Sequence, residues 1–442
     1  MHVLLPSTVS ARPASEIPNG DRNKLFHSDR RFHDWYRFVL SFPPQLVRYY
    51  IQQFHLGADD LLLDPFCGTG TTLVESKLHN VPSIGIEANS FAHFASSVKI
   101  DWTADPIALK ALASQIRDAA TAELEKMGIQ DDWFNSDPSE ATLQALAPEA
   151  EKLILRDSIS PVPLHKALVL LDKIDSYVNS RFHKYFRLAF GNALVFQISN
   201  LRFGPEVGVG RIKVDVPVVR AWFQEISRIC DDLDFSSKGT YAGSRVYHSD
   251  ARNVSALVGE KQVSAVITSP PYPNEKDYTR TTRLESVILG FITNRGELRA
   301  LKKSLLRSNT RGVYKGDTDD EYVIQNTEVQ RIAEEIEHRR IELGKTSGFE
   351  RTYAKVTRLY FGGITKHLRE LQPILKPNAR MAYVVGDQAS YLQVMIRTGR
   401  IIGEIAESLG YELVKIEPFR TRFSTATKTD LNEEVVVLRW PG

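Results

Sequence analysis

Short apolar runs alternate along this chain with longer segments in which apolar residues recur every three or four positions. The short runs predict buried strands and the longer segments predict amphipathic helices. The predicted strands are residues 61–63, 83–86, 244–250, 263–267, 380–385, 412–416 and 434–439. Helices are expected between most of them, over residues 45–54, from Leu73 onward, and over 279–291, 353–371 and 396–409. This order predicts an α/β fold with a doubly wound, mostly parallel, seven-stranded sheet.

Two long stretches interrupt the alternation. Residues 101–239 are mainly helical in pattern, with expected helices at 106–126, 143–154, 163–178 and 181–199, and residues 292–352 are rich in basic side chains. The chain therefore divides into a flexible leader (1–30), three core segments (31–100, 240–291 and 353–442) and two insertions. Residues 203–211 read as a glycine-rich flexible link, and 375–378 as a turn. Five aromatic side chains of segment 181–199 have the spacing of a core face rather than of a base-stacking surface: Phe182, Tyr185, Phe186, Phe190 and Phe196.

Composition excludes several classes of protein. The chain has 442 residues, a formal net charge of +2 and only two cysteines, Cys67 and Cys230, so a disulfide framework or a four-cysteine zinc site is excluded. We expect no metal site. No apolar run reaches the length of a membrane span and no signal peptide is recognisable, so we expect a cytoplasmic protein that does not contact membranes. Any basic surface must be local, because the overall charge is nearly balanced.

A glycine turn follows the first predicted strand. It reads Asp64-Pro-Phe-Cys-Gly-Thr-Gly-Thr-Thr, and a helix is expected directly after it. Two glycines let the backbone approach a ligand closely, and the helix start offers unpaired N–H groups. Glu87 ends the next strand about 20 residues later, where a carboxylate binds ribose hydroxyls in nucleotide sites; alone, it could be a solvated acid at a strand end. The turn lacks the third glycine of a dinucleotide site and the lysine of a phosphate-binding loop, which favours a cofactor with a ribose but no phosphate.

A second loop, Thr268-Ser-Pro-Pro-Tyr272, ends the strand at 263–267. Its two prolines stop strand pairing and prevent an immediate helix. The loop therefore fixes a hydroxyl (Ser269), the carbonyls of Pro270 and Pro271, and an aromatic face (Tyr272) in a small space. These groups can accept hydrogen bonds from an amino group on a flat ring and stack on that ring.

The two loops together resemble those of the amino-methyltransferases of DNA, and the Thr-Ser-Pro-Pro-Tyr form is most similar to the cytosine-N4 branch. The resemblance covers the core segments and not the insertions. It implies a Rossmann-like fold that uses S-adenosyl-L-methionine, with the last strand inserted antiparallel. It makes 31–100 the cofactor half and 240–291 the catalytic half, with target recognition in 101–239. The catalytic residues it implies are Ser269, Pro270, Pro271 and Tyr272, and the cofactor residues are Phe42, Pro43, Asp64, Phe66, Gly68, Thr69, Gly70, Thr71, Glu87, Asp250 and Thr268.

Roles follow from the same resemblance. Asp64 would face the sulfonium side of the cofactor, Glu87 the ribose and Asp250 the adenine amino group. The expected reaction is direct transfer of a methyl group to the N4 amine of a flipped cytosine in double-stranded DNA, with Tyr272 stacked on the base. A cognate restriction endonuclease would fit such an enzyme, and the chain could be a monomer or a dimer.

Other functions remain as alternatives. A serine at the first loop position is also compatible with adenine-N6 methylation, and RNA guanine-N2 methyltransferases carry a similar loop. A catalytically inactive nucleic-acid-binding protein is a further alternative. A nucleotide hydrolase is excluded by the missing lysine. Cys67 is not expected to be a nucleophile, because it lies in the glycine turn, where a small residue packs.

Basic residues outside the two loops are candidates for DNA contact. Residues 295–315 form the most basic window of the chain, and a helix with such spacing could line a phosphate backbone. Arg280 and Arg283 could either meet phosphates or pair with Glu285 or Asp277. The full candidate set is Arg202, Arg211, Lys213, Arg280, Arg283, Arg299, Lys302, Lys303, Arg307 and Arg311.

Overall fold

The structure is a computed structural model that describes residues 17–442 except 39, 133–142, 205 and 425–427. Its centre is a seven-stranded sheet in the order β5-β2-β1-β6-β7-β9-β8. The strands are β1 (Leu62–Asp64), β2 (Ser83–Glu87), β5 (Ser244–His248), β6 (Val263–Thr268), β7 (Leu375–Gly386), β8 (Glu412–Ser424) and β9 (Thr429–Arg439). The five adjacent strands β5, β2, β1, β6 and β7 are parallel to one another, whereas β9 is antiparallel to both β7 and β8. The predicted α/β fold with a mostly parallel seven-stranded sheet is confirmed.

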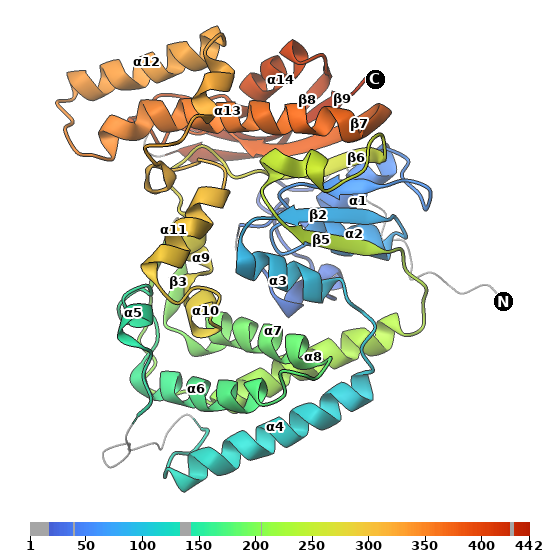
Figure 1. The fold of residues 1–442 in the computed structure, drawn as a ribbon, viewed down its shortest axis with the longest axis vertical. Coiled ribbons are helices and arrows are strands. Elements are labelled where there is room, and N and C mark those ends of the chain that lie inside the picture. Colours follow the sequence, from blue (N-terminus) through green and yellow to red (C-terminus); the bar gives the residue numbers. More distant parts are fainter. Residues whose placement is uncertain (1–16, 39, 133–142, 205, 425–427) are drawn as a thin grey trace.

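Helices cover both faces of this sheet (Figure 1). On one face, α1 (Pro44–Gln53) packs against Ala265 and Ile267 of β6. On the other face, α13 (Tyr353–Leu371) and α14 (Thr398–Ser408) share a core with Val266, which lies between Ala265 and Ile267 in β6. Alternate residues of one strand thus enter two different cores, as the period of a strand requires. The strand is apolar throughout because both of its faces are buried.

The first insertion forms a helical layer below the sheet in Figure 1. Its helices are α4 (Pro106–Lys126), α5 (Pro148–Glu151), α6 (Pro161–Asp175), α7 (His183–Ala193) and α8 (Val218–Ser236). The apolar faces of α4, α6, α7 and α8 share one core with Phe91 and Val98 of α3 (Ser90–Lys99), so the insertion is continuous with the sheet domain rather than a separate unit. A π-helical turn (Leu194–Ile198) extends α7, and it leaves Phe196 44% exposed, so the prediction that Phe196 is a core residue is wrong.

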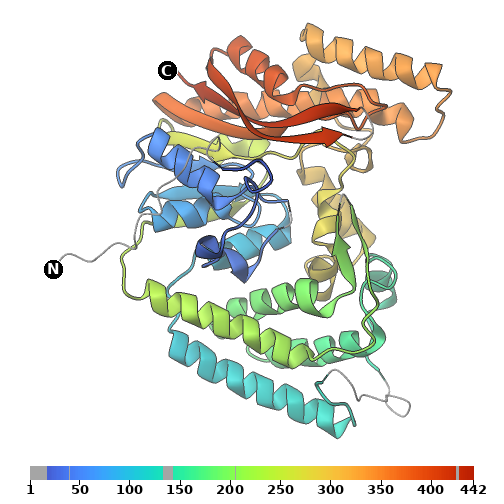
Figure 2. The ribbon, with the colours of Figure 1, turned by 180° about the vertical axis from the view of Figure 1, so that it is seen from behind.

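Part of the link expected over 203–211 belongs to a two-stranded hairpin and is therefore not flexible. Strands β3 (Leu201–Phe203) and β4 (Val207–Val209) pair antiparallel, and Figure 2 shows them rising from the helical layer. The glycines of this segment suggested flexibility, but Gly208 lies within β4 and is paired with Arg202. The helix expected over 143–154 is likewise reduced to α5; its flanking residues 143–147 and 152–154 are not helical.

The second insertion runs from the helical layer back to the sheet (Figure 1). It follows two short helices, α9 (Tyr278–Thr281) and α10 (Arg283–Ile288), which replace the single helix expected over 279–291. It then forms α11 (Arg295–Ser304) and α12 (Thr327–Glu342). The remaining core helix, α2 (Thr71–Leu78), follows the glycine turn and is not part of this insertion. A turn of 3-10 helix at Asp319–Val323 lies directly on α13, where a Cβ on Gly362 would be 1.8 Å from the Asp319 carbonyl oxygen. Glycine at 362 is what permits this contact.

Two other expectations need correction. The turn expected at 375–378 lies inside β7. The pairing of β7 with β6 shifts register between Val263 and Ala265, and this irregularity accommodates Pro377 within the strand. The described part of the leader is tied to the sheet: Arg22 donates to the Phe419 carbonyl (3.0 Å) and Asn19 to the Thr421 carbonyl (2.7 Å). Residues 17–30 are therefore not a flexible leader; residues 1–16 lie outside the described residues.

Candidate active site

A cavity of about 260 Å³ opens at the carboxyl ends of β1, β2, β5 and β6, where parallel sheets bind ligands. It contains both loops that the sequence singled out. The predicted cofactor and catalytic residues that line it are Phe42, Phe66, Gly68, Thr69, Thr71, Glu87, Asp250, Ser269, Pro270, Pro271 and Tyr272, and one predicted DNA-contact residue, Lys302, lines it as well. Four predicted cofactor residues do not line it: Pro43, Asp64, Gly70 and Thr268.

The glycine turn owes its shape to two residues with positive φ. Gly68 has a φ of 52° and Gly70 a φ of 84°, a region that residues with a Cβ rarely adopt. Gly70 immediately precedes α2, and a Cβ there would be 3.1 Å from the Cβ of Ser96. The glycines therefore serve the tight turn onto α2 and the packing of α3, while the backbone of residues 68 and 69 faces the cavity.

Cys67 packs beneath the turn. Its side chain is 5% exposed, and a Cβ on Gly85 would be 2.8 Å from its sulfur, so β2 comes very close. Burial raises the pKa of the Cys67 thiol well above its ordinary value, with smaller contributions from Glu87 and Asp64. A neutral, buried thiol is not an activated nucleophile.

Glu87 stands at the cavity wall at the end of β2. One carboxylate oxygen accepts from the Gly68 N–H (2.8 Å) and the other from the Asn89 N–H (2.7 Å). Each oxygen keeps a second lone pair for another donor. Removal from water raises the pKa of Glu87 to about 7, although the two backbone donors act in the opposite direction.

Asp64 lies under the cavity floor and joins the two loops. One of its oxygens accepts from the Thr268 hydroxyl (2.6 Å) and from the Phe66 N–H (3.1 Å). The other is buried without a hydrogen-bond partner in the described residues. Burial raises the pKa of Asp64 to about 6. In this structure Asp64 and Thr268 position the loops rather than line the cavity.

The loop after β6 is fixed by three contacts. The Ser269 hydroxyl donates to the Val384 carbonyl (3.0 Å), and the Tyr272 N–H donates to the Tyr278 hydroxyl (3.0 Å). The Tyr272 ring lies against Gly386, where a Cβ would be 3.0 Å from Cε2 of the ring. The serine proton is thus engaged by the sheet, and the serine oxygen remains an acceptor.

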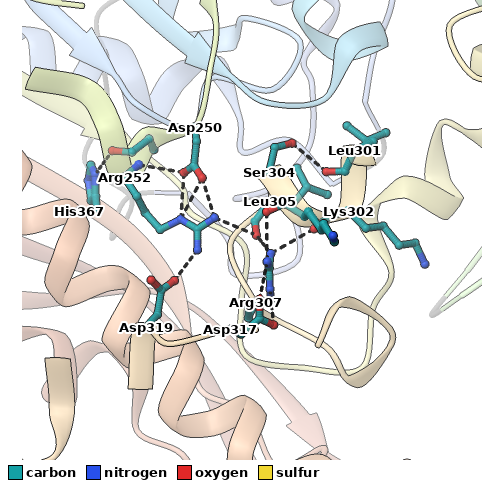
Figure 3. A network of polar contacts seen from close by, with 12 residues as sticks. Asp250, Arg252, Leu301, Lys302, Ser304, Leu305, Arg307, Asp317, Asp319 and His367 are labelled. Carbon is teal, nitrogen blue, oxygen red and sulfur yellow. Dashed lines mark hydrogen bonds and ion pairs between the residues drawn. The ribbon is translucent and has the colours of Figure 1, made fainter. Parts of the chain in front are cut away.

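Asp250 is held by an arginine on the same turn (Figure 3). The Arg252 guanidinium donates to both Asp250 oxygens, at 2.6 to 3.0 Å, and also pairs with Asp319 of the second insertion. The Arg252 side chain therefore ties the acid at the cavity edge to the insertion, whose residues Leu305, Leu306, Ser308 and Asn309 also line the cavity.

Several lining residues were missed by the sequence analysis. Asn23 and Phe38 come from the N-terminal segment, and the loop after Tyr272 supplies Asn274 and Lys276. Strands β8 and β9 supply Phe419, Arg420, Arg422 and Glu433. Arg420 and Arg422 lie in a basic segment, which is a local signal in the sequence. The other residues have no local signal, because the fold brings them to the cavity from distant segments.

The predicted DNA-contact residues separate into two groups. Some are engaged internally. Arg307 is 5% exposed and donates to Asp317 (2.8 Å) and to carbonyls at the end of α11, so in this structure its side chain is held within the fold and is not presented to solvent. Lys213 donates to the Gln197 and Ser199 carbonyls, both at 2.7 Å. Arg283 and Lys302 both lie within 4.0 Å of Asp277, and of the two earlier interpretations of Arg283 the pairing is the one present.

The others remain at the surface. Arg280 lies 3.3 Å from Glu206 of the hairpin. The exposed residues are Arg202, Arg211, Arg299, Lys303 and Arg311. On α11, Arg299 and Lys303 both approach the Tyr314 ring, at 5.4 and 5.6 Å from its centre.

Two features are absent from the described residues. No group of three or more His, Cys, Asp or Glu side chains is arranged to hold a metal ion. Within the same part of the chain, no helix combines the length and apolar character needed to cross a membrane.

Comparison with known proteins identifies relatives. Residues 17–96 match the model of the N6/N4 methyltransferase family, described as DNA methylase. The chain is 25% identical to the type II methyltransferase M.BsoBI of Geobacillus stearothermophilus, over 90% of this chain and 82% of that protein. It is 22% identical to the type II methyltransferase M.AvaI of Nostoc sp., over 86% and 79% of the two chains. A shorter segment, 16% of this chain and 13% of the relative, is 35% identical to the type II methyltransferase M.MjaII of Methanocaldococcus jannaschii.

Proposed function

We propose that this relative of the N6/N4 DNA methylases is a type II DNA methyltransferase, which transfers a methyl group from S-adenosyl-L-methionine to the N4 amine of cytosine in double-stranded DNA. One observation carries the proposal: the glycine turn and the Ser269–Tyr272 loop open into one cavity and are joined beneath it by the Asp64–Thr268 hydrogen bond (2.6 Å). Relatives named type II methyltransferases over most of the chain support it.

The residues at the first end of the cavity fit the cofactor. Glu87 keeps free lone pairs for ribose hydroxyls, and Asp250 at the edge can accept from an adenine amino group. Phe66 and Phe42 provide apolar walls, and no lysine is present in the turn to bind a phosphate. The cofactor would supply an electrophilic methyl group on a sulfonium.

The residues at the other end can hold an amino base. Tyr272 offers its ring for stacking, with the ring position set by Gly386. Ser269 donates its own proton to Val384, so its oxygen and the neighbouring proline carbonyls can accept the two amine protons. Accepting both protons orients the nitrogen lone pair, and orientation is the main contribution that a binding site makes to such a transfer. The nitrogen can lose its proton to solvent after methylation, so no general base is needed.

The base must leave the DNA stack to reach this cavity. Our candidates for contacts with the DNA backbone are exposed basic residues on α11 (Arg299 and Lys303), in the 3-10 turn after it (Arg311), and in or just after the hairpin (Arg202 and Arg211). The helical insertion of residues 101–239 is our candidate for target recognition.

The test is mass spectrometry of nucleosides from unmodified DNA that has been incubated with the protein and methyl-labelled S-adenosyl-L-methionine. We expect label in N4-methylcytosine, and its loss in the Ser269→Ala and Tyr272→Ala variants, each checked for native folding by circular dichroism. Label in N6-methyladenine would retain the site and overturn the base assignment. Label in RNA alone, or in neither nucleic acid, would overturn the proposed function.

A further inference from the structure

Lys276 occupies an unusual position just after the catalytic loop. It lines the main cavity and also a second, smaller cavity formed with Phe203 and Val207 of the hairpin. Its backbone is fixed, because its N–H donates to the Asn274 side chain (3.0 Å) and its carbonyl accepts from Asn309 (3.1 Å). The side chain is half-buried, yet in the described part of the chain its ammonium group has neither a carboxylate within 4.0 Å nor a hydrogen bond.

Arg422 is a second cation without a carboxylate partner at the same mouth. It is exposed on β8 and lines the main cavity, and the described residues include no ion pair with it. Its neighbour Arg420 differs, since that guanidinium makes two hydrogen bonds to Glu433 (2.7 and 3.0 Å). Glu433, the acid that β9 supplies to this wall, is thus already neutralised by Arg420. Lys276 and Arg422 therefore repel each other.

This arrangement costs free energy in the absence of an anion. Burial lowers the pKa of Lys276, and the charge of Arg422 lowers it further, although the more distant carboxylates of Glu433 and Glu206 act in the opposite direction. A half-buried cation is stabilised by a partner of opposite charge, and a phosphate oxygen satisfies both a lysine and an arginine. The cofactor end of the cavity is lined instead by two acids, Glu87 and Asp250, so it does not offer a comparable site for an anion.

We propose that Lys276 and Arg422 form a phosphate subsite, which binds a backbone phosphodiester of the nucleotide whose base enters the cavity. The inference rests on the proposed function and adds the positioning of the target strand. Lys276 sits between the base-binding end of the main cavity and the hairpin cavity, which also holds Arg280 and Arg311. The two acids of the hairpin cavity, Glu206 and Asp277, already pair with Arg280 and Lys302. The strand would therefore pass from the catalytic loop toward the hairpin. Binding the phosphate there would fix the extruded nucleotide from its backbone while Tyr272 holds its base.

The experiment measures the salt dependence of binding to a fluorescent DNA duplex by the full chain. The variants are Lys276→Gln and Arg422→Gln, with Arg400→Gln as matched control, because Arg400 is 65% exposed on α14 and lines neither cavity. Each lost phosphate contact should reduce the slope of log affinity against log salt by about 0.9. We expect that reduction in both variants, a several-fold higher KM for DNA and unchanged affinity for S-adenosyl-L-methionine. Lys276→Arg should retain the wild-type slope.

The outcomes separate the subsite from the proposed function. If the wild type methylates DNA but both glutamine variants keep its slope and KM, the subsite is wrong and the function stands. If Lys276→Gln instead weakens binding of the cofactor, the cation serves the cofactor carboxylate and the inference is overturned. If the wild type neither binds nor methylates DNA, the proposed function and the subsite both fail.

Discussion

The Thr268 hydroxyl donates to Asp64 over 2.6 Å, and this single hydrogen bond connects the end of β1 to the end of β6. Both residues are fully buried, and the second oxygen of Asp64 has no partner in the described residues. The contact joins the loop that would bind the cofactor to the loop that would bind the base. Neither residue lines the cavity, so under the proposed function the pair would act by positioning the two loops, together with the pairing of β1 and β6.

Thr268→Val should uncouple the two loops. Valine removes the donor and leaves a buried carboxyl short of a hydrogen bond, which costs about 1–3 kcal/mol in the free energy of unfolding. Methyl transfer should fall as well, because the relative position of the loops is no longer fixed. Chemical denaturation and initial rates measure the two effects. Thr268→Ser keeps the hydroxyl and should resemble the wild type; equal stability of the valine and serine variants would contradict the role of the hydrogen bond.

Gly386→Ala should disturb catalysis through Tyr272. The added Cβ would lie 3.0 Å from Cε2 of the Tyr272 ring and 3.3 Å from Cγ of Glu433, so the ring must move. A misplaced stacking surface should lower kcat by about 10- to 100-fold while leaving cofactor affinity unchanged. Steady-state kinetics and titration calorimetry measure these quantities.

The control for this change is Gly243→Ala. No atom lies within 4 Å of a Cβ added at Gly243, and its φ is not positive, so this variant should behave as the wild type. A Gly386→Ala enzyme with normal kcat would mean that the Tyr272 ring tolerates displacement.

Glu285 should make stability depend on pH. It is fully buried on α10, where one oxygen accepts from the Tyr36 hydroxyl (2.5 Å) and the other has no partner in the described residues. Burial raises the pKa of Glu285 from 4.5 to about 8. Between these two values the folded protein keeps the proton and the unfolded chain loses it. Stability must therefore fall as pH rises through this window, by up to about 1.4 kcal/mol per pH unit for this group.

The measurement is the difference between wild type and Glu285→Gln in denaturation midpoints at pH 5, 6.5 and 8. Glutamine keeps an acceptor for Tyr36 and cannot ionise, so the variant should gain on the wild type as the pH rises. Taking the difference removes the contributions of Asp64 and Glu87, whose pKa values burial also raises. Parallel curves for the two proteins would show that Glu285 is ionised at neutral pH.

Periodicity and short motifs predicted the sheet, the order of its elements and the two loops, because these features are encoded by neighbouring residues. Interactions between distant segments left no such signal. Asn23 and Glu433 line one cavity but are far apart in the sequence, and only the closed sheet brings them together. Arg307 and Arg299 share one basic window, yet one is buried and the other exposed. A charge pattern gives the number of basic residues, whereas the path of the chain decides which of them meet solvent.

That difference between Arg299 and Arg307 leads to a paired prediction. Arg299→Ala should reduce the salt-dependence slope of DNA binding by about 0.9, because it removes one exposed cation from α11. Its effect on unfolding should stay within about 0.5 kcal/mol. Arg307→Ala should instead destabilise the fold by about 3 kcal/mol or more, because Asp317, which accepts from Arg307 at 2.8 and 2.9 Å, loses its partner. Duplex binding at several salt concentrations and urea denaturation measure the two effects. A reduced slope for Arg307→Ala with unchanged stability would mean that this side chain leaves its buried position to contact DNA.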